Sequence, residues 1–598
     1  MSVDSQATNS SPIENLITEH IDIWSSAIKR KSSAGRGSSK KIELYGIKKL
    51  RELILELAVR GKLVAQDASD EPASILLERI AKEKAQLVKE GKIKKQKPLP
   101  DISEDEKPFE LPDGWAWARL GEYAEVKGGK RLPKGHSLIS DKTNHAYIRV
   151  TDMKDGSVNL QGLQYLTSDT QKLISQYIIS KNDLYITIAG TIGEIGSIPE
   201  ELDGMNLTEN AAKIVFNRIE RLWLKQSLSS RFSMKQFIEK VNQLAQPKLA
   251  LHRILSAILP IPPLAEQHRI VAKVDELMAL CDQLEAQTES SLDAHKTLVT
   301  VLLDTLVNSQ NAEELAENWT RISVHFDTLF TTEQSIDQLK QTILQLAVTG
   351  KLVEQNPNDE PACVLLERIA AEKADLIKQG KIKKQKPLPD ITGEEKPFDL
   401  PEGWDVTRLD DICFGVTSGS TPPKDKFDDK KGVPYLKVYN IKEQKIAFDY
   451  RPQFIDIEHH RKKLTRSILY PGDVVMNIVG PPLGKIAIIP DSFPEWNCNQ
   501  AIVFFRPIEK ILNNYIYTYL KSARFLDDIE LIGTAGQDNI SITKSRSIIL
   551  PMPPLKEQHR IVAKVDELMA ICDQLKAQLS EAQTTQLNLA DALVKEAL

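Results

Sequence analysis

The side chains best suited to chemistry in this sequence belong to two copies of one acidic motif. Pro100-Asp101 precedes Asp105-Glu106-Lys107, and Pro389-Asp390 precedes Glu394-Glu395-Lys396. Paired carboxylates with a lysine would suit metal-assisted hydrolysis of a phosphodiester, provided that the carboxylates converge on one ion. The few residues between them are too short for a strand-turn-strand that would bring them together. We therefore interpret both copies as proline-rich linker.

Other groups of catalytic type stand alone. His268 and His559 occupy equal positions in two EQHR sequences, with no second His or Cys at metal-ligand spacing. The glycine-rich run 190–196 lacks the dinucleotide-binding spacing, and we predict a turn there. The sequence contains neither a GxxxxGK[ST] phosphate loop nor an Asn/Asp-Pro-Pro-aromatic methyltransferase tetrapeptide. These observations argue against an enzyme active site in this chain.

The sequence contains a repeated framework, which must position the functional side chains of the chain. Residues 61–115 match residues 350–404 at 40 of 55 positions without a gap, and EQHRIVAKVDELMA occurs unchanged at 266–279 and 557–570. This repeat is far longer than that of a solenoid. We predict a pseudo-twofold duplication of a whole module, which carries two different surfaces on equivalent supports.

The framework is predicted to contain long helices. Beyond each EQHR sequence, apolar residues step by 4, 3, 4 and 3 positions, which is coiled-coil spacing. A single helix over 264–307 would be about 65 Å long at 1.5 Å per residue, too long to lie inside one small domain. Helices at 44–57 and 336–347 are the expected antiparallel partners of the two EQHR helices.

The stretches between the repeated blocks, 116–263 and 405–554, differ in sequence over most of their span. Both contain short strand patterns bounded by turn residues, followed by helical stretches at about 221–243 and 509–530. We predict that each is a mixed α/β globule of about 150 residues. The strand candidates are 146–150, 184–188, 433–438 and 474–478.

Charge is distributed unevenly along the chain. The whole sequence has a net charge of -5, yet residues 107–263 hold 20 Lys/Arg against 16 Asp/Glu, and residues 396–554 hold 21 against 20. The variable stretches therefore carry the positive balance. Because attraction to phosphate is local and screened over about 10 Å, an acidic framework does not exclude a nucleic-acid partner.

Cysteine usage and hydropathy indicate the cellular compartment in which the protein is expected. The five cysteines are odd in number and form no CxxC pair, which favours a reducing compartment. Cys281 and Cys572 occupy apolar helix positions and are predicted to be small core residues. With no signal-peptide pattern and no run of 18 apolar residues, we expect a cytoplasmic protein that is neither secreted nor inserted into a membrane.

Together these features resemble the specificity (S) subunit of type I restriction-modification enzymes. Two dissimilar globular stretches alternate with repeated helices, and each stretch is closed by PPLxEQxRIVxKVDELMxxCDQL. The GKLVxQxxxDEPAxxLLERI and GKIKKQKPLPDI blocks are similar to those of the larger S subunits in one subgroup. The resemblance covers nearly the whole chain beyond about residue 40.

The resemblance implies a fold and a function. The fold would be mixed α/β (α+β), with two target recognition domains separated by long antiparallel coiled-coil helices. Each domain would read one half of a bipartite site on double-stranded DNA. The helices would set the spacing and bind two methyltransferase (M) subunits, and restriction/translocase (R) subunits would join through the complex. The chain itself would have no catalytic activity and no cofactor, since the M subunit uses S-adenosylmethionine and the R subunit uses ATP.

We therefore expect six regions along the chain. They are an N-terminal helix and flexible link (1–41), a repeated helical region (42–106), the first target recognition domain (107–263), a central region with a long coiled-coil helix (264–395), the second target recognition domain (396–554) and a C-terminal coiled-coil helix (555–598).

Positions that recur in register between the two domains are candidates for DNA contact. Arg149 and Lys437 follow equivalent strands, and Asn210 and Gln500 are aligned just before an apolar strand. A structural amide explains each polar position as well as base contact does, and a lone lysine is more often a plain surface charge. The predicted DNA-binding residues are Lys130, Arg131, Lys134, Arg149, Asn210, Gln246, Lys248, Lys424, Lys437, Asn440, Lys485, Gln500, Gln537 and Asn539.

Two other functional classes stay open on the sequence. A coiled-coil scaffold whose globular domains bind proteins would share this layout but would show no selectivity for DNA sequence. A stand-alone restriction enzyme would need catalytic motifs that the sequence lacks.

Overall fold

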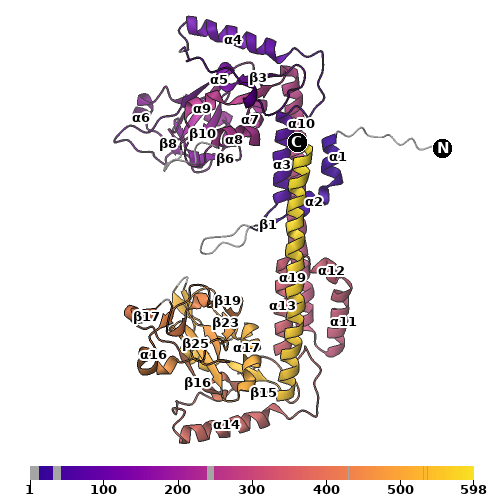
Figure 1. Ribbon diagram of the computed structural model, residues 1–598, viewed down its shortest axis with the longest axis vertical. Helices are drawn as coiled ribbons and strands as arrows, with labels where there is room; N and C mark the ends of the chain where they lie inside the picture. Colours follow the sequence, from indigo (N-terminus) through magenta and orange to yellow (C-terminus); the bar gives the residue numbers. More distant parts are fainter. Residues whose placement is uncertain are drawn as a thin grey trace, which may run out of the picture. The chain divides into compact units, whose positions relative to one another are not determined.

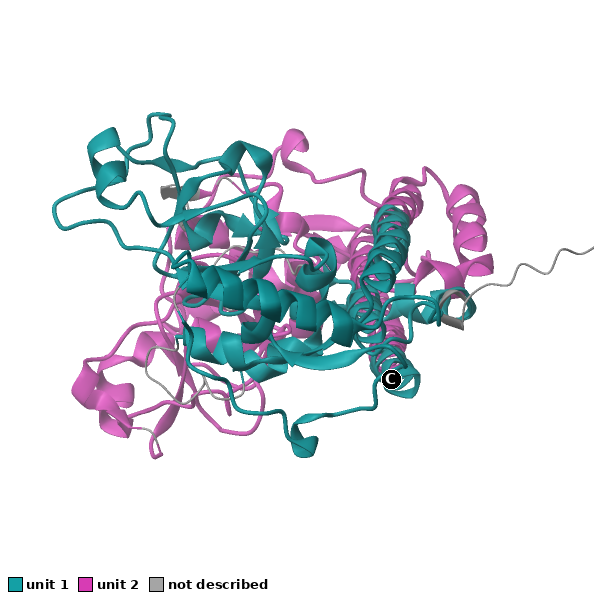
Figure 2. Cartoon of the chain, turned by 90° about the horizontal axis from the view of Figure 1, so that it is seen from above, with its two compact units in different colours: residues 1–291, 582–598 teal, residues 292–581 magenta. Residues whose placement is uncertain are grey.

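The computed structural model describes residues 12–30, 42–93, 95–238, 248–428, 430–529, 531–534 and 537–598. The chain divides into two units, which Figure 2 shows in different colours. Unit 1 comprises residues 1–291 and 582–598, and unit 2 comprises residues 292–581. Each unit contains one copy of the repeated framework and one variable domain (Figure 1).

The helical framework of unit 1 pairs α3 (Tyr45–Val59) with the first part of α10 (Leu264–Asn308). The Arg51 guanidinium bridges Asp282 at 2.7 Å and Glu285 at 2.6 Å. Helix α3 ends just before Gly61, which has a φ of +67°. The next N–H, that of Lys62, donates to the Leu57 carbonyl, so the two residues cap the C-terminus of the helix.

Unit 2 repeats this pairing with α13 (Glu333–Val348) and α19 (Leu555–Ala597). Lys340 pairs with Asp573, and Lys576 pairs with Asp337 at 2.8 Å, so the two helices run antiparallel as predicted. Cys572 lies in their apolar interface at 2% exposure, which confirms its predicted core role. Helix α10 has 45 residues and α19 has 43, so both predicted long helices are confirmed.

The first variable domain contains two four-stranded sheets. The order is β11-β10-β13-β4 in one sheet and β8-β5-β12-β9 in the other. The strand patterns at 146–150 and 184–188 are confirmed as β5 and β10. The strands are β4 (Ala124–Gly128), β5 (Ala146–Ile148), β8 (Gln164–Tyr165), β9 (Ile178–Ile179), β10 (Leu184–Thr187), β11 (Ile195–Ser197), β12 (Met205–Leu207) and β13 (Ala211–Phe216).

The second variable domain follows the same plan despite its different sequence. Its sheets have the orders β16-β25-β22-β23 and β17-β21-β18-β24, and the patterns at 433–438 and 474–478 are confirmed as β18 and β22. The strands are β16 (Cys413–Ser418), β17 (Phe427–Asp428), β18 (Val433–Leu436), β21 (Phe454–Ile455), β22 (Val474–Asn477), β23 (Ile486–Ile488), β24 (Asn497–Cys498) and β25 (Ile502–Pro507).

A short antiparallel pair closes each variable domain at its base. In unit 1, β3 (Ala116–Arg119) pairs with β14 (Ile258–Ile261), and in unit 2, β15 (Asp405–Arg408) pairs with β28 (Ile549–Met552). The chain thus enters and leaves each domain at one place. There the buried indole N–H of Trp115 donates to Glu266 at the start of α10, at 3.0 Å.

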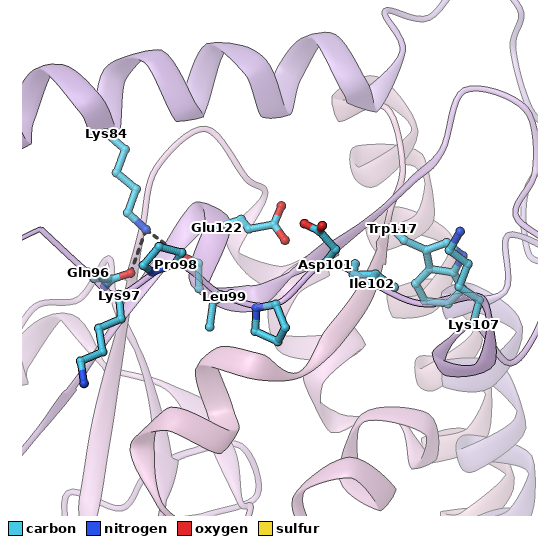
Figure 3. A pocket seen from close by; sticks show the side chains of 12 residues that line it. Lys84, Gln96, Lys97, Pro98, Leu99, Asp101, Ile102, Lys107, Trp117 and Glu122 are labelled. Atoms are coloured by element: carbon cyan, nitrogen blue, oxygen red, sulfur yellow. Dashed lines mark hydrogen bonds between the residues drawn. The ribbon is translucent and has the colours of Figure 1, made fainter.

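Helix α4 (Ala73–Lys89) extends from the framework of unit 1, and its Glu83 and Lys84 side chains bond to the first domain. Figure 3 shows Lys84 pointing from α4 toward the extended proline segment, where it donates to Gln96 at 3.1 Å and to the Gly121 carbonyl at 2.6 Å. Burial lowers the pKa of Lys84. In unit 2, Lys373 on α14 (Ala362–Lys378) donates to the Asp410 carbonyl in the same way.

The acidic motif has a structural role in both copies. The Glu106 carboxylate receives two bonds from the Arg119 guanidinium, at 2.8 and 3.0 Å, and the Arg119 side chain is 4% exposed. Glu395 and Arg408 repeat this contact at 3.1 Å. Within the described ranges, no three His, Cys, Asp or Glu side chains form a group that could hold a metal ion.

Two predicted helices are shorter than expected. The stretch 221–243 forms α7 (Arg221–Ser229) and α8 (Arg231–Ile238), while residues 239–243 lie outside the described residues. Ser230 separates the two helices because it is extended, with its hydroxyl bonded to the Ser227 carbonyl at 2.7 Å. In the other stretch, 509–530, the α-helix covers only Asn513–Lys521.

None of the helices in the described part of the chain combines the length and the apolar character needed to cross a bilayer.

Candidate nucleic-acid interface

Three of the predicted residues of the first domain line one hollow where several strands end. A cavity of about 390 Å³ is bordered by Arg131, Arg149 and Asn210, together with Tyr147 and Glu209. Its walls are the segments that follow β4, β5 and β12. Side chains at strand ends have a fixed backbone and access to solvent, which base reading in a DNA groove requires.

Gly129 brings two walls of this cavity into backbone contact. Its N–H bonds to the Ala211 carbonyl at 3.0 Å, and the N–H of Lys130 bonds to the Leu207 carbonyl at 2.9 Å. A Cβ at Gly129 would lie 2.1 Å from the Thr208 carbonyl oxygen, so only glycine fits. The Tyr147 hydroxyl then donates to the Lys130 carbonyl at 2.8 Å, which fixes the loop.

We call this backbone contact between two loops the crossing. The second domain forms the same crossing with Gly419, Ser420 and Tyr435. The Gly419 N–H bonds to the Ile502 carbonyl at 3.0 Å, and the Ser420 N–H bonds to the Cys498 carbonyl at 3.0 Å. A Cβ at Gly419 would lie 2.1 Å from the Cys498 oxygen. The Tyr435 hydroxyl donates to the Ser420 carbonyl at 2.8 Å, as Tyr147 does in the first domain.

These contacts correct one predicted correspondence. Ile188 bonds to the carbonyl of Asn210, whereas the equivalent Ile478 bonds to that of Ala501, so Asn210 corresponds to Ala501. Glu209 is therefore the counterpart of Gln500. The sequence alignment was wrong by one residue because the loops between the aligned strands differ in length, and only the backbone pairing reveals where the difference falls.

Each domain presents a pair of polar side chains at this crossing. In the first, the Arg131 guanidinium bonds to the Glu209 carboxylate at 2.8 Å, with side-chain exposures of 81% and 25%. In the second, the Thr421 hydroxyl donates to Gln500, and both side chains are exposed. Burial acts to raise the pKa of Glu209, but hydrogen bonds from Arg131, Thr208 and Tyr147 leave it lowered, so the carboxylate is ionised at neutral pH.

Arg149 and Lys437 differ in how they are held. Arg149 donates two bonds to the Asp152 carboxylate, at 2.6 and 3.0 Å, and its pKa is raised chiefly by this contact. The Lys437 ammonium lies 5.1 Å from the centre of the Phe427 ring. A DNA contact by Arg149 would share its guanidinium with Asp152.

Asn440 is corrected from a DNA contact to a structural residue. It is 1% exposed, its Oδ1 accepts from the Lys437 N–H at 3.0 Å, and its amide donates to the Tyr450 carbonyl at 3.0 Å. Both ends of the side chain are therefore used to hold the turn that carries Lys437.

Replacing Asn440 with alanine should lower the free energy of unfolding of unit 2 by about 1–3 kcal/mol, because the change leaves buried backbone groups without partners. Gln500→Ala, an exposed amide in the same domain, should change it by about 0.5 kcal/mol or less. Hydrogen exchange of amides in each unit would measure both effects. Equal stability of the two variants would remove the structural role assigned to Asn440.

The remaining predicted residues lie at varied positions. Lys130 has its ammonium 5.3 Å from the centre of the Tyr177 ring, and Lys485 is half-buried before β23. The Oδ1 of Asn539 is buried without a hydrogen-bond partner in the part of the chain that the structure describes. Lys134, Lys248 and Lys424 are exposed. Gln246 lies outside the described residues, and Gln537 is described only as the first residue of β27 (Gln537–Asn539).

Comparison with known proteins identifies the family. The model of the type I restriction modification DNA specificity domain matches the chain twice, at residues 112–294 and 401–582. The chain belongs to this family of specificity subunits. Both matches contain one variable domain and the start of the long helix that follows it, so each copy of the family unit falls within one copy of the internal repeat.

Two relatives from Escherichia coli match nearly the whole chain. The specificity subunit of type I restriction enzyme EcoAI is 44% identical over 98% of this chain and 100% of its own length. That of EcoEI is 42% identical over the same shares. Among solved structures, the HsdS subunit from Thermoanaerobacter tengcongensis is 19% identical, covers 82% of this chain and 98% of its own, and has a TM-score of 0.39.

Sequence reasoning missed Glu209, Thr421 and the two supporting tyrosines of this interface. An acidic residue is an unattractive candidate beside a polyanion, so Glu209 could not be selected by charge. The one available signal was the Gly-Lys-Arg sequence at 129–131, which places an arginine directly after a glycine turn.

Proposed function

We propose that each variable domain reads one half of a bipartite site on double-stranded DNA. The observation that carries this proposal is the shared crossing of Gly129 and Gly419, which supports different side chains in the two domains. A common backbone with different exposed groups suits two readers of different sequences. The exposed lysines Lys134, Lys248 and Lys424 would contact phosphate, a role that positions a protein on DNA without selecting a sequence.

The framework would supply the spacing and the binding surface for methyltransferase subunits. Residues 61–115 and 350–404 match at 40 of 55 positions and make equivalent contacts, whereas the domains that they carry differ over most of their span. A surface that is the same in both halves fits two copies of one partner. Because an α-helix has a fixed rise per residue, the lengths of α10 and α19 would set the number of base pairs between the half-sites.

In this proposal the chain performs no reaction itself. The methyltransferase subunits would transfer the methyl group to adenine, and restriction/translocase subunits would join through the same complex. The chain would contribute the choice of DNA site and the placement of its partners on that site.

Methylation of a DNA library by this chain with its methyltransferase subunits tests the proposal. We expect modification at one bipartite sequence. Replacing residues 116–263 with the equivalent stretch of another family member should change one half of that sequence and leave the other half and the spacing unchanged. Methylation without sequence preference would overturn the proposal and favour a protein-binding scaffold, and a change in both halves would overturn the assignment of one domain to one half.

A further inference from the structure

We propose that one pair of side chains in each domain determines the identity of one base pair in its half-site, an inference that rests on the proposed function. The variable pair, as we name it, is Arg131 with Glu209 in the first domain and Thr421 with Gln500 in the second. Each pair lies at the crossing of two loops and is held by a hydrogen bond between its two members.

The backbone around the variable pair is the same in both domains. The residue before Arg131 and the residue before Thr421 each accept a bond from a tyrosine hydroxyl at 2.8 Å. The glycines one position earlier pack against carbonyl oxygens with no room for a Cβ. Two domains of different sequence therefore carry this pair on the same backbone support. A fixed position with changed side chains is what a specificity determinant requires.

The two pairs differ in the base edges that they can recognise. Arginine donates two bonds to O6 and N7 of guanine, and a carboxylate accepts from the N4 amino group of cytosine. Arg131 and Glu209 together therefore fit a G·C base pair. Glutamine both donates and accepts at the N6 and N7 edge of adenine, and the methyl group of threonine can contact the methyl group of thymine. Thr421 and Gln500 therefore fit an A·T base pair.

The neighbouring polar groups are less suited to this role. The Nε and one Nη of Arg149 already donate to the Asp152 carboxylate, and Asn440 is buried. Lys130 and Lys437 lie over aromatic rings, and an ammonium is a point charge that suits phosphate more than a base edge. In the variable pair, Arg131, Thr421 and Gln500 are exposed and Glu209 is half-buried, and each pair combines a hydrogen-bond donor with an acceptor.

Exchange of the pair between the domains tests this inference. The double variant Arg131→Thr with Glu209→Gln, in the full chain with its methyltransferase subunits, would be assayed on a library with both half-sites randomised. We expect the preference at one position of the first half-site to change from G·C to A·T by about tenfold or more, with the second half-site unchanged. The reciprocal variant, Thr421→Arg with Gln500→Glu, should change one position of the second half-site from A·T to G·C.

Lys134→Ala is the matched control, because it removes an exposed charge from the same loop without touching the pair. It should weaken methylation of all sites about equally. Thermal unfolding of every variant reports whether the domain is intact, and Glu209→Gln alone, which retains an acceptor for Arg131, gives a second readout if the double variant unfolds. If the unchanged chain methylates a bipartite site and the folded variants keep its preference at every position, this inference fails and the proposed function stands. If the unchanged chain shows no preference, both fail.

Discussion

Arg119→Ala should lower the free energy of unfolding of unit 1 by about 3 kcal/mol, one of the largest effects that a single change in this chain can have. Arg119 is 3% exposed and donates to the carbonyls of Pro100, Ser256 and Asp101 at 2.7, 2.8 and 3.1 Å, as well as to Glu106. Loss of the guanidinium leaves three carbonyls without a donor. It also separates the proline segment from the base of the domain.

The measurement must resolve the two units, because a chain of two units need not unfold in one step. Amide hydrogen exchange of β3 and β14 should accelerate in the Arg119→Ala variant, while that of β15 and β28 stays unchanged. Arg408→Ala should produce the opposite pattern, since Arg408 repeats the contacts with Pro389, Ser547 and Glu395. Arg131→Ala is the control, because its side chain is 81% exposed and its loss should cost about 1 kcal/mol or less. An Arg119→Ala variant as stable as this control would contradict the structural role.

These contacts give a physical reason for the repeated framework. Residues 61–115 contain one partner of three of these contacts: Lys84 for the Gly121 carbonyl, Glu106 for Arg119, and Trp115 for Glu266 at the start of α10. Their equivalents recur in unit 2 at nearly the same distances. On the domain side the partners are the Gly121 carbonyl and Arg119 of β3 at the base of the domain. The rest of each domain can therefore change without losing these contacts.

The framework and the class of fold could be predicted from the sequence because they depend on periodic patterns. The apolar steps beyond EQHR predicted a helix over 264–307, and α10 covers Leu264–Asn308. Strands β5, β10, β18 and β22 followed from short runs of β-branched and aromatic residues between turns. Such patterns report burial on one face of a regular element, which is a local property of the chain.

The candidate interface was less predictable because it depends on contacts between distant segments. Asn440 and Gln500 are both polar and both follow strands, yet the first is buried in a turn and the second is exposed. No local pattern separates these outcomes. The correspondence of Glu209 with Gln500 likewise depends on backbone hydrogen bonds, from Ile188 to Asn210 and from Ile478 to Ala501, which reveal where the loops differ in length.

Gly129→Ala should remove the selectivity of the first half-site and lower the free energy of unfolding of unit 1 by about 3 kcal/mol, as expected for severe overpacking. The added Cβ would lie 2.1 Å from the Thr208 oxygen and 2.3 Å from the Leu207 oxygen, both of the backbone. Backbone atoms cannot rotate away as a flexible side chain can, so the two loops must separate. Arg131 and Glu209 would then lose their common support.

Gly128 provides a matched control at the adjacent position. A Cβ there would meet only a methyl group of Leu251 at 3.7 Å, an ordinary contact, so Gly128→Ala should change stability by about 0.5 kcal/mol or less and keep the site preference. Gly419→Ala should affect the second half-site alone, because its Cβ would lie 2.1 Å from the Cys498 oxygen. Library methylation and unit-resolved hydrogen exchange measure both consequences. If Gly129→Ala and Gly128→Ala behave alike, the crossing of the two loops does not support recognition. If Gly129→Ala and Gly419→Ala each remove selectivity only from the half-site of the altered domain, the loops are rigid supports and the domains act independently.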